Sequence, residues 1–527
     1  VPFTASLSRL LPETIYYYRA VASNAAATVY GTPKSFSTPA FTTVPVASVG
    51  DPAAGVSGGE FASFGNPAIN TQNFVAFEAL LANGAGGVTA TDNSGIWAED
   101  GTGTRDLVAR TGQVAPGAGS GIFQSLSSPV YNDNDAVAFL GELKIGSGTK
   151  ASAANGIWSN LGRSLALVAR QGSPATGIPG ATFKTFGQIA LPDQGKVVFL
   201  ATTGNGKAGI WAGSSAASLQ LVIAESGTLN GKTIQTLGFL PALPYVAGQS
   251  RSFAQATGAL VMNASFTDKS TGIIEIAGTT PQLIALSGSA APGVGGGYFE
   301  AFSSPSVNAN GNIAMAATLA KGSGGVGATD NTGIWAEDNT STLRLVARTG
   351  SAAPGTSSVF TTLGNPVYNN NDAVAFRGTL KMGKGQASAS ESSGIWANNS
   401  GSLQLVALQG SQAAGCPPGA TFRLFNAIAL PDEGAVILLA TLNNDPRIGV
   451  TAATNLGIWT VDVAGNMQLI ARKGEVVSGR QITSFSFLPV LKSIGGQGRN
   501  FDYATGDLIF QSGYSDKSSG LSAIIFP

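Results

Sequence analysis

Short apolar runs separated by turn residues recur along most of the chain, in units of roughly sixty residues. Each unit opens with a spaced apolar pair and passes through a turn into a run such as Val75-Ala76-Phe77. It then reaches Gly-Ile-Trp and ends in a run such as Leu345-Val346-Ala347-Arg348. No helical period is visible, and four strands per unit is the pattern of a propeller blade. Eight opening pairs predict an all-β, eight-bladed β-propeller: Phe61 and Phe64, Phe123 and Leu126, Phe183 and Phe186, Ile234 and Leu237, Phe299 and Phe302, Phe360 and Leu363, Phe422 and Phe425, Ile482 and Phe485.

A longer period is superimposed on this unit. The spacing from Trp97 to Trp335 equals the spacing from Trp158 to Trp396, and Trp211 and Trp459 are the other two tryptophans. Units four and eight lack tryptophan and carry Gly272-Ile273-Ile274 and Gly520-Leu521-Ser522 in its place. The chain is therefore predicted to contain two copies of a four-blade block.

The two ends of the repeat region complete each other. The eighth unit stops after its third strand, while residues 43–55 align with residues 343–355, which include a fourth strand. A strand at residues 42–49 is thus predicted to complete the last blade and to close the ring, so that residues 39–527 form one propeller. Closure removes the free edge that an open array of blades would expose.

Residues 1–38 have a different pattern. Alternation around Tyr16, Tyr18, Ala20 and Ala22 indicates a strand, and the run from Leu10 to Tyr16 resembles the tyrosine corner of a fibronectin type III domain. This resemblance implies a partial β-sandwich module of about three strands. Upstream strands are then either left out of this chain, which starts at Val1 like a trimmed piece, or supplied by another molecule.

The turn between the first and second strands has a recurring asparagine. It reads Asn70-x-x-Asn73-x-x-Ala76-Phe77 in unit one, and units two, five and six repeat it from Asn132, Asn308 and Asn369. This pattern resembles the bacterial choice-of-anchor tandem-repeat surface proteins with an Asn-x-x-Gly-x-x-Ala-Phe motif. Where the family has Gly, this chain often has Asn or Asp, which tolerate a left-handed turn. The resemblance implies an exported protein held by a separate anchor and implies no enzymatic activity.

Composition excludes several kinds of chemistry. The chain has no histidine and one cysteine, Cys416, which excludes the usual zinc sites, Ser-His and Cys-His pairs, and internal disulfides. No carboxylate pair stands out as a general acid and base, so we predict no catalytic residues and a protein that is not an enzyme. Lys plus Arg equals Asp plus Glu at 29 each, which argues against nucleic-acid partners. No apolar run reaches the roughly 18 residues needed for membrane insertion.

Two long insertions between first and second strands, in units four and eight, are candidate ligand sites. Long loops on a rigid scaffold often carry binding residues, and an Arg beside an aromatic ring suits a carboxylate or a sugar. The alternative is a loop that covers the end of the channel. The candidate ligand-binding residues are Arg251, Phe253, Arg499, Phe501 and Tyr503.

Two turns are rich in Asp and Asn, which are the oxygen ligands that calcium prefers. The same residues are common in ordinary tight turns, and their spacing matches no EF-hand. Calcium is thus the one cofactor considered. Its candidate ligands are Asp133, Asp135, Asn370 and Asp372. The tryptophans likewise have two interpretations, as a sugar-binding surface or as packing between blades.

These features predict a non-enzymatic, extracellular or cell-surface structural or interaction protein. Low charge, at 11% of residues, and the N-terminal module favour that location. The predicted partners are envelope proteins or further copies of the chain, which would assemble into a filament through the incomplete module. The alternatives are a carbohydrate-binding, lectin-like propeller with glycan partners, and a polysaccharide lyase or hydrolase.

Overall fold

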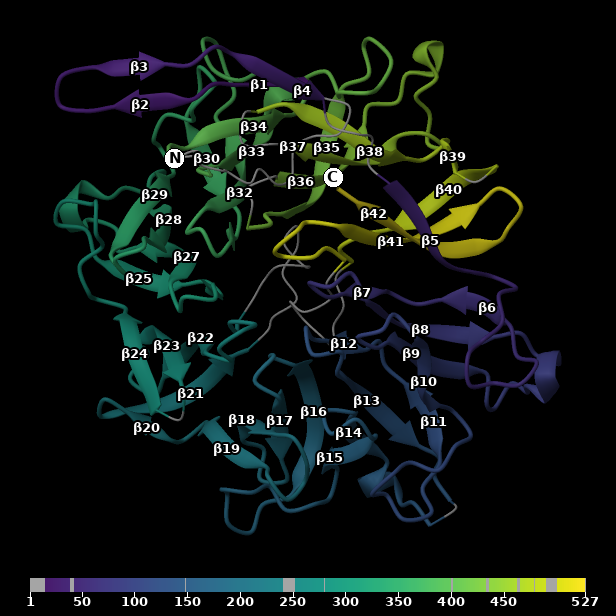
Figure 1. Ribbon diagram of the computed structural model, residues 1–527. Coiled ribbons are helices and arrows are strands. Elements are labelled where there is room, and N and C mark those ends of the chain that lie inside the picture. Colours follow the sequence, from purple (N-terminus) through teal and green to yellow (C-terminus); the bar gives the residue numbers. More distant parts are fainter. Residues whose placement is uncertain are drawn as a thin grey trace.

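The computed structural model describes residues 15–37, 42–146, 148–239, 252–278, 280–399, 401–432, 436–461, 465–477, 479–489 and 500–526. Eight antiparallel sheets of four principal strands stand in a ring, as Figure 1 shows. The fold is an eight-bladed β-propeller, as the repeat pattern predicted. Within blades 1 to 7 the principal strands follow one another in sequence order, with each hydrogen-bonded to the next, whereas blade 8 ends with a strand from the N-terminal end of the chain.

The first block contains blades 1 to 4. Some blades add a two-residue strand, either between the first two strands or before the first. The strands of this block are β6 (Phe61–Phe64), β7 (Ala68–Ile69), β8 (Val75–Leu81), β9 (Ser94–Glu99) and β10 (Arg105–Arg110); β11 (Phe123–Leu126), β12 (Val130–Tyr131), β13 (Val137–Leu143), β14 (Asn155–Ser159) and β15 (Ala166–Arg170); β16 (Phe183–Ala190), β17 (Val197–Thr203), β18 (Ala208–Gly213) and β19 (Gln220–Ala224); β20 (Thr228–Leu229), β21 (Lys232–Gly238), β22 (Leu260–Phe266), β23 (Thr271–Ala277) and β24 (Thr280–Leu286).

The second block contains blades 5 to 8 and repeats this layout. Its strands are β25 (Phe299–Phe302), β26 (Ser306–Val307), β27 (Ile313–Leu319), β28 (Thr332–Glu337) and β29 (Leu343–Arg348); β30 (Phe360–Leu363), β31 (Val367–Tyr368), β32 (Val374–Leu380), β33 (Ser393–Ala397) and β34 (Gln404–Leu408); β35 (Phe422–Ala429), β36 (Val436–Leu442), β37 (Leu456–Val461) and β38 (Met467–Arg472); β39 (Val476–Val477), β40 (Arg480–Ser486), β41 (Leu508–Tyr514), β42 (Ser519–Ile525) and β5 (Thr42–Ser48).

The ring closes where the sequence predicted. β5, from the N-terminal end, pairs antiparallel with β42, and Ala47 lies opposite Leu521 while Pro45 lies opposite Ser522. The core across this seam joins Ala47, Ile509 and Leu521 to the aromatic residues of blade 1. The seam is therefore packed like any other contact between neighbouring blades.

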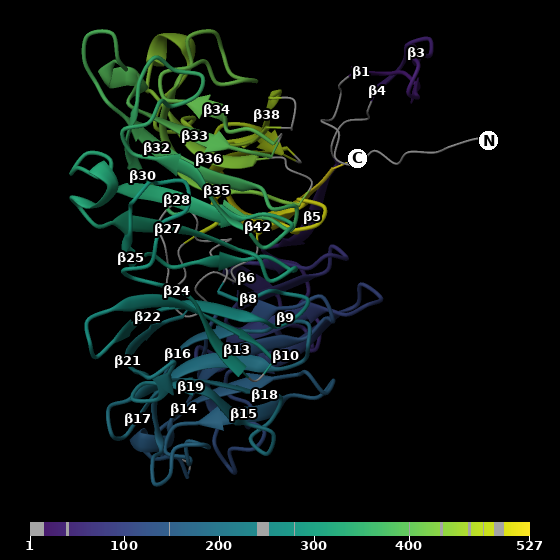
Figure 2. The same ribbon diagram turned by 90° about the vertical axis from the view of Figure 1, so that its left-hand side faces the viewer.

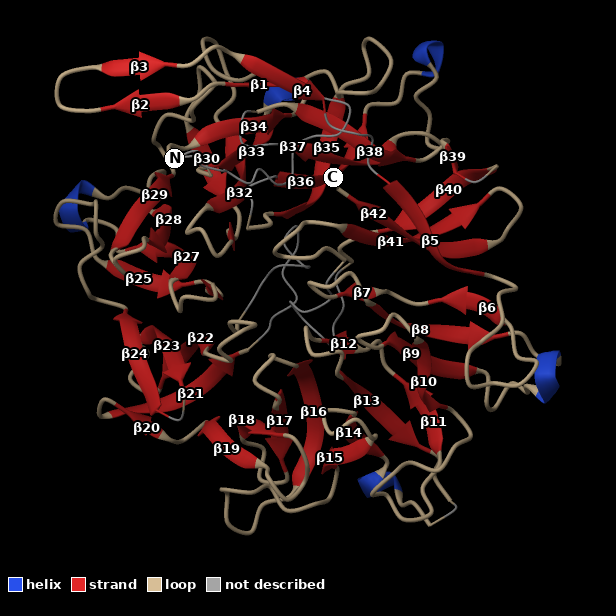
Figure 3. Ribbon diagram, viewed as in Figure 1, coloured by secondary structure: helices blue, strands red, loops and turns tan. Residues whose placement is uncertain are grey.

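The two ends of each blade face different surroundings. Figure 1 shows β7 and β12 near the centre of the ring, so the turns between first and second strands point inward. Single helical turns follow the second strands of several blades, mostly toward the periphery (Figure 3). They are η1 (Ala85–Gly87), η2 (Ala151–Ala153), η3 (Ser323–Gly325), η4 (Ala389–Glu391) and η5 (Pro446–Ile448).

The peripheral loops are held in place rather than free. The Arg110 guanidinium donates to the Asp92 carbonyl and carboxylate at 2.6 and 2.7 Å, and Arg348 does the same to Asp330 in the second block. In blade 1, Gly86 has φ 59° and lies so close to the Ser57 carbonyl that a Cβ there would be 2.2 Å from it. Gly86 therefore allows the two loops to pack closely, in addition to permitting the turn.

All six tryptophans are completely buried, which confirms the packing interpretation and rules out a sugar-binding surface. In each, the indole N–H donates at 2.8–2.9 Å to a backbone carbonyl of the loop that enters its blade. The acceptors for Trp97, Trp158, Trp211, Trp335, Trp396 and Trp459 are Ala54, Pro116, Thr176, Pro292, Pro354 and Ala414.

The same contact explains why two blades lack tryptophan. Ile274 and Ser522 occupy its register position in blades 4 and 8. Those blades are entered through the tight hairpins β20–β21 and β39–β40, which replace the longer loop. The hairpin takes the place of the loop that supplies the carbonyl acceptor, so the shortened entry and the missing tryptophan are one structural change.

Residues 15–37, the described part of the N-terminal module, contain four short strands. β1 (Ile15–Tyr18) pairs with β4 (Lys34–Ser37), and β2 (Val21–Ser23) pairs with β3 (Thr28–Tyr30). Figure 2 shows these strands standing off one face of the ring. Isolated two-stranded sheets are marginally stable in water. The fibronectin-like character of the module stays a prediction, and the residues of the predicted tyrosine corner before Ile15 lie outside the described residues.

Candidate functional site

The inward turns form a polar ring that links neighbouring blades. The side-chain oxygen of Asn70 accepts the backbone N–H groups of Gln72 and Phe74, which folds its own turn. Its side-chain nitrogen donates to the Asp135 carboxylate of blade 2 at 2.9 Å. Asn132, Asn308 and Asn369 fold their own turns in the same way and donate to the next blade. The asparagine of the motif is thus a link between blades, and all four are 0% exposed.

The fourth position of the motif has the left-handed backbone that the sequence predicted. The φ angles are 65° at Asn73, 59° at Asp135, 85° at Gly311 and 58° at Asp372. In two of these turns the carboxylate, of Asp135 or Asp372, also accepts a hydrogen bond from a tyrosine hydroxyl. The Tyr131 hydroxyl donates to Asp135 at 3.2 Å, and burial raises the pKa of Tyr131 far above its ordinary value. This tyrosine therefore stays a neutral donor.

The candidate calcium ligands are engaged by donors of the protein. Asp133 accepts the Thr71 N–H at 3.1 Å, and the Asn370 side-chain oxygen accepts the Ala309 N–H at 2.7 Å. Asp372 accepts from Asn308, Asn312 and the Tyr368 hydroxyl. The two pairs lie four blades apart in the ring, so the structure does not bring them together. Within the described residues, no group of three or more His, Cys, Asp or Glu side chains is placed to hold a metal.

Removal of divalent cations is expected to leave the melting temperature unchanged. The oxygens that calcium would need already accept N–H and O–H groups in links between blades, so these links need no ion. Thermal melts of the full chain with EDTA and with added Ca²⁺ measure this. A melting temperature that falls in EDTA and recovers on addition of Ca²⁺ would favour the calcium interpretation.

Three of the five predicted ligand residues of the two long insertions lie within the described part of the chain, and all three are buried. Phe253, Phe501 and Tyr503 are 1%, 0% and 4% exposed. The rings of Phe501 and Tyr503 pack against each other at 4.8 Å within the core around blades 7 and 8. These rings are used in core packing, and the role of the insertions in ligand binding stays a prediction. Arg251 and Arg499 lie outside the described residues.

Two equivalent glutamates differ between the blocks in a way that sequence reasoning missed. Glu99 of β9 accepts from Arg105 at 2.7 Å, whereas Leu343 stands opposite its counterpart, Glu337 of β28. Burial, opposed by the Ile313 N–H and reinforced by nearby carboxylates, raises the pKa of Glu337. At the start of the outer strand, Arg105 lies opposite Glu99 in the first block, whereas Leu343 lies opposite Glu337 in the second block. This pairing register is the signal that reveals the difference.

Glu337→Gln is expected to stabilise the protein at neutral pH and to have no effect in acid. The pKa of Glu337 in the folded protein lies above the ordinary value of 4.5. The contribution of the neutral acid to folding stability is therefore complete below pH 4.5 and is lost as the pH rises through the folded pKa. Glutamine keeps the acceptor for the Ile313 N–H without the charge. Thermal melts near pH 4 and pH 8 measure the difference. Glu99→Gln is the matched control with the opposite sign, since it removes the ionic partner of Arg105. Stabilisation of both variants would contradict this account.

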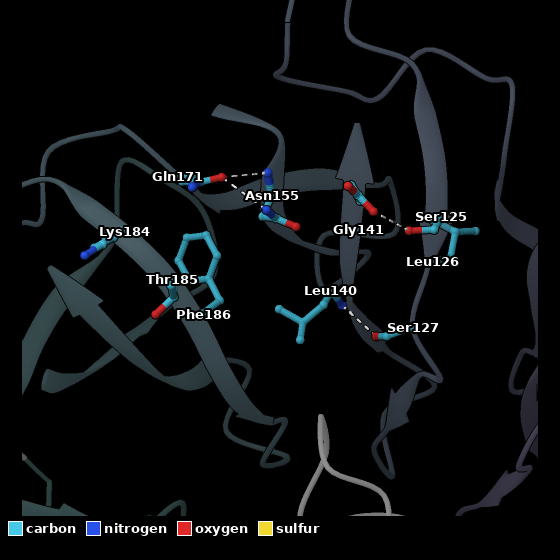
Figure 4. A pocket seen from close by; sticks show the side chains of 12 residues that line it. Ser125, Leu126, Ser127, Leu140, Gly141, Asn155, Gln171, Lys184, Thr185 and Phe186 are labelled. Carbon is cyan, nitrogen blue, oxygen red and sulfur yellow. Dashed lines mark hydrogen bonds between the residues drawn. The ribbon is translucent and has the colours of Figure 1, made fainter. Parts of the chain in front are cut away.

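A groove between blades 2 and 3 has mixed polar and apolar walls (Figure 4). It has a volume of about 390 Å³ and is bounded by the face of blade 2 and the first strand of blade 3. The Asn155 side chain donates to Gln171 at 3.1 Å, and the Ser125 hydroxyl donates to Glu142 at 3.1 Å. Phe186 is half-buried and turns its ring toward the groove. These residues come from separate strands and belong to no motif, so the sequence did not indicate them.

A second groove of the same construction lies between blades 1 and 2. Its volume is about 540 Å³, and its walls include Asn93, Thr111, Gln124 and Lys144. In both grooves, the start of a third strand and the end of a fourth strand face the first strand of the next blade. Two neighbouring blade junctions therefore present similar polar hollows.

Comparison with known proteins places the chain in a family. A model described as a family of unknown function (DUF7453) matches residues 21–280, 274–352 and 342–524. The chain belongs to this family. No curated protein sequence matches the chain.

Several solved structures resemble this member of the family. One is titled as the structure of the Dos1 propeller, with a TM-score of 0.39, 9% identity, and coverage of 88% of this chain and 93% of that chain. Another is the WD40 domain of SCAP from fission yeast, with a TM-score of 0.38, 8% identity, and coverage of 92% of this chain and 94% of that chain. A third is polysaccharide lyase Uly1, with a TM-score of 0.33, 10% identity, and coverage of 92% of this chain and 99% of that chain. Enzymes and non-enzymes share this fold, and similarity at this level carries no argument about activity. Within the described residues, no helix is long and apolar enough to cross a bilayer.

Proposed function

We propose that this chain is a non-enzymatic cell-surface interaction protein, in which the propeller is a scaffold and the N-terminal module joins one copy to the next. The observation that carries this proposal is the exposure of the module. Fourteen large hydrophobic side chains are exposed among the described residues, and six of them lie within residues 15–30: Ile15, Tyr17, Tyr18, Val21, Val29 and Tyr30. Tyr17 is 76% exposed and Val29 is 65% exposed.

A second copy of the chain is the partner that this surface fits. Among the described residues β1 is paired with β4 and β2 with β3, and a strand from a second copy would extend either two-stranded sheet. Positive and negative residues balance at 29 each, so long-range charge repulsion does not oppose association of copies. A module that inserts into a different surface of the next copy makes a heterologous contact, which propagates into a filament.

Sedimentation velocity of the full chain across a range of concentrations tests this proposal. We expect species larger than a monomer, and we expect the double variant Tyr17→Ser with Val29→Ser to shift them toward the monomer. The matched control is Tyr298→Ser with Val114→Ser, which removes one exposed tyrosine and one exposed valine from the propeller. A chain that stays monomeric at every concentration, or a control that dissociates equally, would refute the proposal.

Location and anchoring form part of the same proposal. The low content of charged residues and the resemblance of the asparagine motif to bacterial surface proteins support an exterior location. Envelope proteins are the other partners that the module would fit. Turnover of any polysaccharide by the purified chain would overturn the non-enzymatic assignment.

A further inference from the structure

The groove between blades 2 and 3 has the composition of a binding site for a neutral, hydroxyl-rich ligand. Its uncharged polar side chains are two amides, from Asn155 and Gln171, and the hydroxyls of Ser125, Ser127 and Thr185. Asn155 donates to Gln171 and Ser125 donates to Glu142, so a ligand would add to or exchange with these contacts. Amides and hydroxyls both donate and accept hydrogen bonds, as the hydroxyls of a sugar ring require. Its volume lies within the range of about 300 to 1,000 Å³ that is usual for small-molecule sites.

The charged and apolar residues of the groove further restrict the class of ligand that it can bind. Glu142 and Lys184 contribute one charge of each sign, so the groove has no net attraction for a polyanion or a polycation. Leu140 and Phe186 are both half-buried and supply an apolar surface beside the polar groups (Figure 4). A pyranose ring has a matching pair of surfaces, one made of C–H groups and one rim of hydroxyls.

The neighbouring groove extends this site along the ring. The hollow between blades 1 and 2 carries Asn93, Thr111, Gln124 and Lys144, which again combine amides, a hydroxyl and one cation. It is related to the first by one step of the blade repeat. A ligand built from repeating units can occupy both grooves, and occupation of two linked sites raises affinity without new kinds of contact.

The geometry points to a polysaccharide-binding surface across blades 1 to 3, which takes neutral hexose units into the two adjacent grooves. This inference goes beyond the proposed assembly and does not depend on the N-terminal module. It needs no bond cleavage, since the surface only holds the polymer.

The second block provides a matched control. Thr362 of β30 occupies the register position of Ser125, because Ser125 lies opposite Glu142 and Thr362 lies opposite Thr379. The corresponding junction between blades 6 and 7 has Arg377 and Arg423 where the groove has Leu140 and Lys184. A substitution at Thr362 therefore has the same backbone setting without the groove's balance of charges.

Affinity electrophoresis of the full chain in native gels that contain dextran, laminarin or galactomannan tests the inference. We expect retardation by at least one of these neutral polysaccharides. Ser125→Trp places a large side chain in the groove and is expected to weaken this binding at least about tenfold, because one of two linked sites is lost. Thr362→Trp is expected to bind like the unaltered chain.

Three results would overturn the inference. They are no retardation in any of the three gels, unchanged binding by Ser125→Trp, and equal loss by Thr362→Trp. Circular dichroism melts confirm that both variants are folded before binding is compared. Sedimentation of the same variants separates this inference from the assembly proposal, since neither substitution touches the module.

Discussion

Ala47→Asp is expected to open the ring at its seam. Ala47 is 2% exposed and packs with Leu521 and Ile509 against blade 1, so a carboxylate there would be buried without a partner. We expect the free energy of unfolding to fall by about 3 kcal/mol or more, and β5 to detach before the rest of the ring unfolds. Hydrogen exchange at β42, combined with urea denaturation, measures both effects.

Val44→Asp is the matched control on the same strand. Val44 is 40% exposed, so its carboxylate remains in water and stability should change by less than about 0.5 kcal/mol. If Ala47→Asp left both the unfolding midpoint and the exchange at β42 unchanged, the pairing of the N-terminal strand with β42 would not be holding the ring closed.

Trp158→Ala is expected to lower the free energy of unfolding by about 3 to 5 kcal/mol. Trp158 is fully buried, packs edge-to-face on Phe123 at 4.9 Å and stacks on Phe139 at 6.3 Å. Its loss leaves a cavity and removes the donor for the Pro116 carbonyl. Urea denaturation followed by circular dichroism measures the change.

Trp158→Phe separates the two contributions. Phenylalanine keeps most of the packing but cannot donate to the Pro116 carbonyl, so a smaller loss of about 1 to 2 kcal/mol is expected. A loss as large as that of alanine would mean that the loop contact dominates. No loss in either variant would contradict the role assigned to the tryptophans.

The architecture was predictable because the chain repeats itself. Eight apolar pairs gave the blade number, and the alignment of residues 43–55 with residues 343–355 gave the closing strand, which the pairing of β5 with β42 confirms. Repetition supplies eight observations of the same local pattern. The module of residues 1–38 occurs once, so its pattern offered a single observation, and its fibronectin-like character stays a prediction.

Binding residues were harder to predict from the sequence. Phe253, Phe501 and Tyr503 looked exposed because they stand in long insertions, yet each is buried at its junction. Which side of a loop packs depends on the neighbouring blade, which is roughly sixty residues away in the chain. The groove of Ser125, Asn155 and Phe186 depends on the same kind of distant contact, so local pattern gave no sign of it.

The asparagine motif shows how a short pattern can have two roles. Its turn geometry could be predicted, because Asn, Asp and Gly at the fourth position all adopt positive φ. Its link to the next blade could not be predicted, because the Asn70 amide meets Asp135 of the neighbouring blade, 65 residues away in the chain. Links of this kind make blade stability a property of neighbouring pairs, as in other repeat proteins.

Electron microscopy of the undenatured full chain tests the central claim most directly. The account predicts rings joined at regular intervals along a fibre, with the Tyr17→Ser and Val29→Ser double variant dispersed as single rings. Single rings for the unaltered chain, at every concentration imaged, would contradict assembly through the N-terminal module.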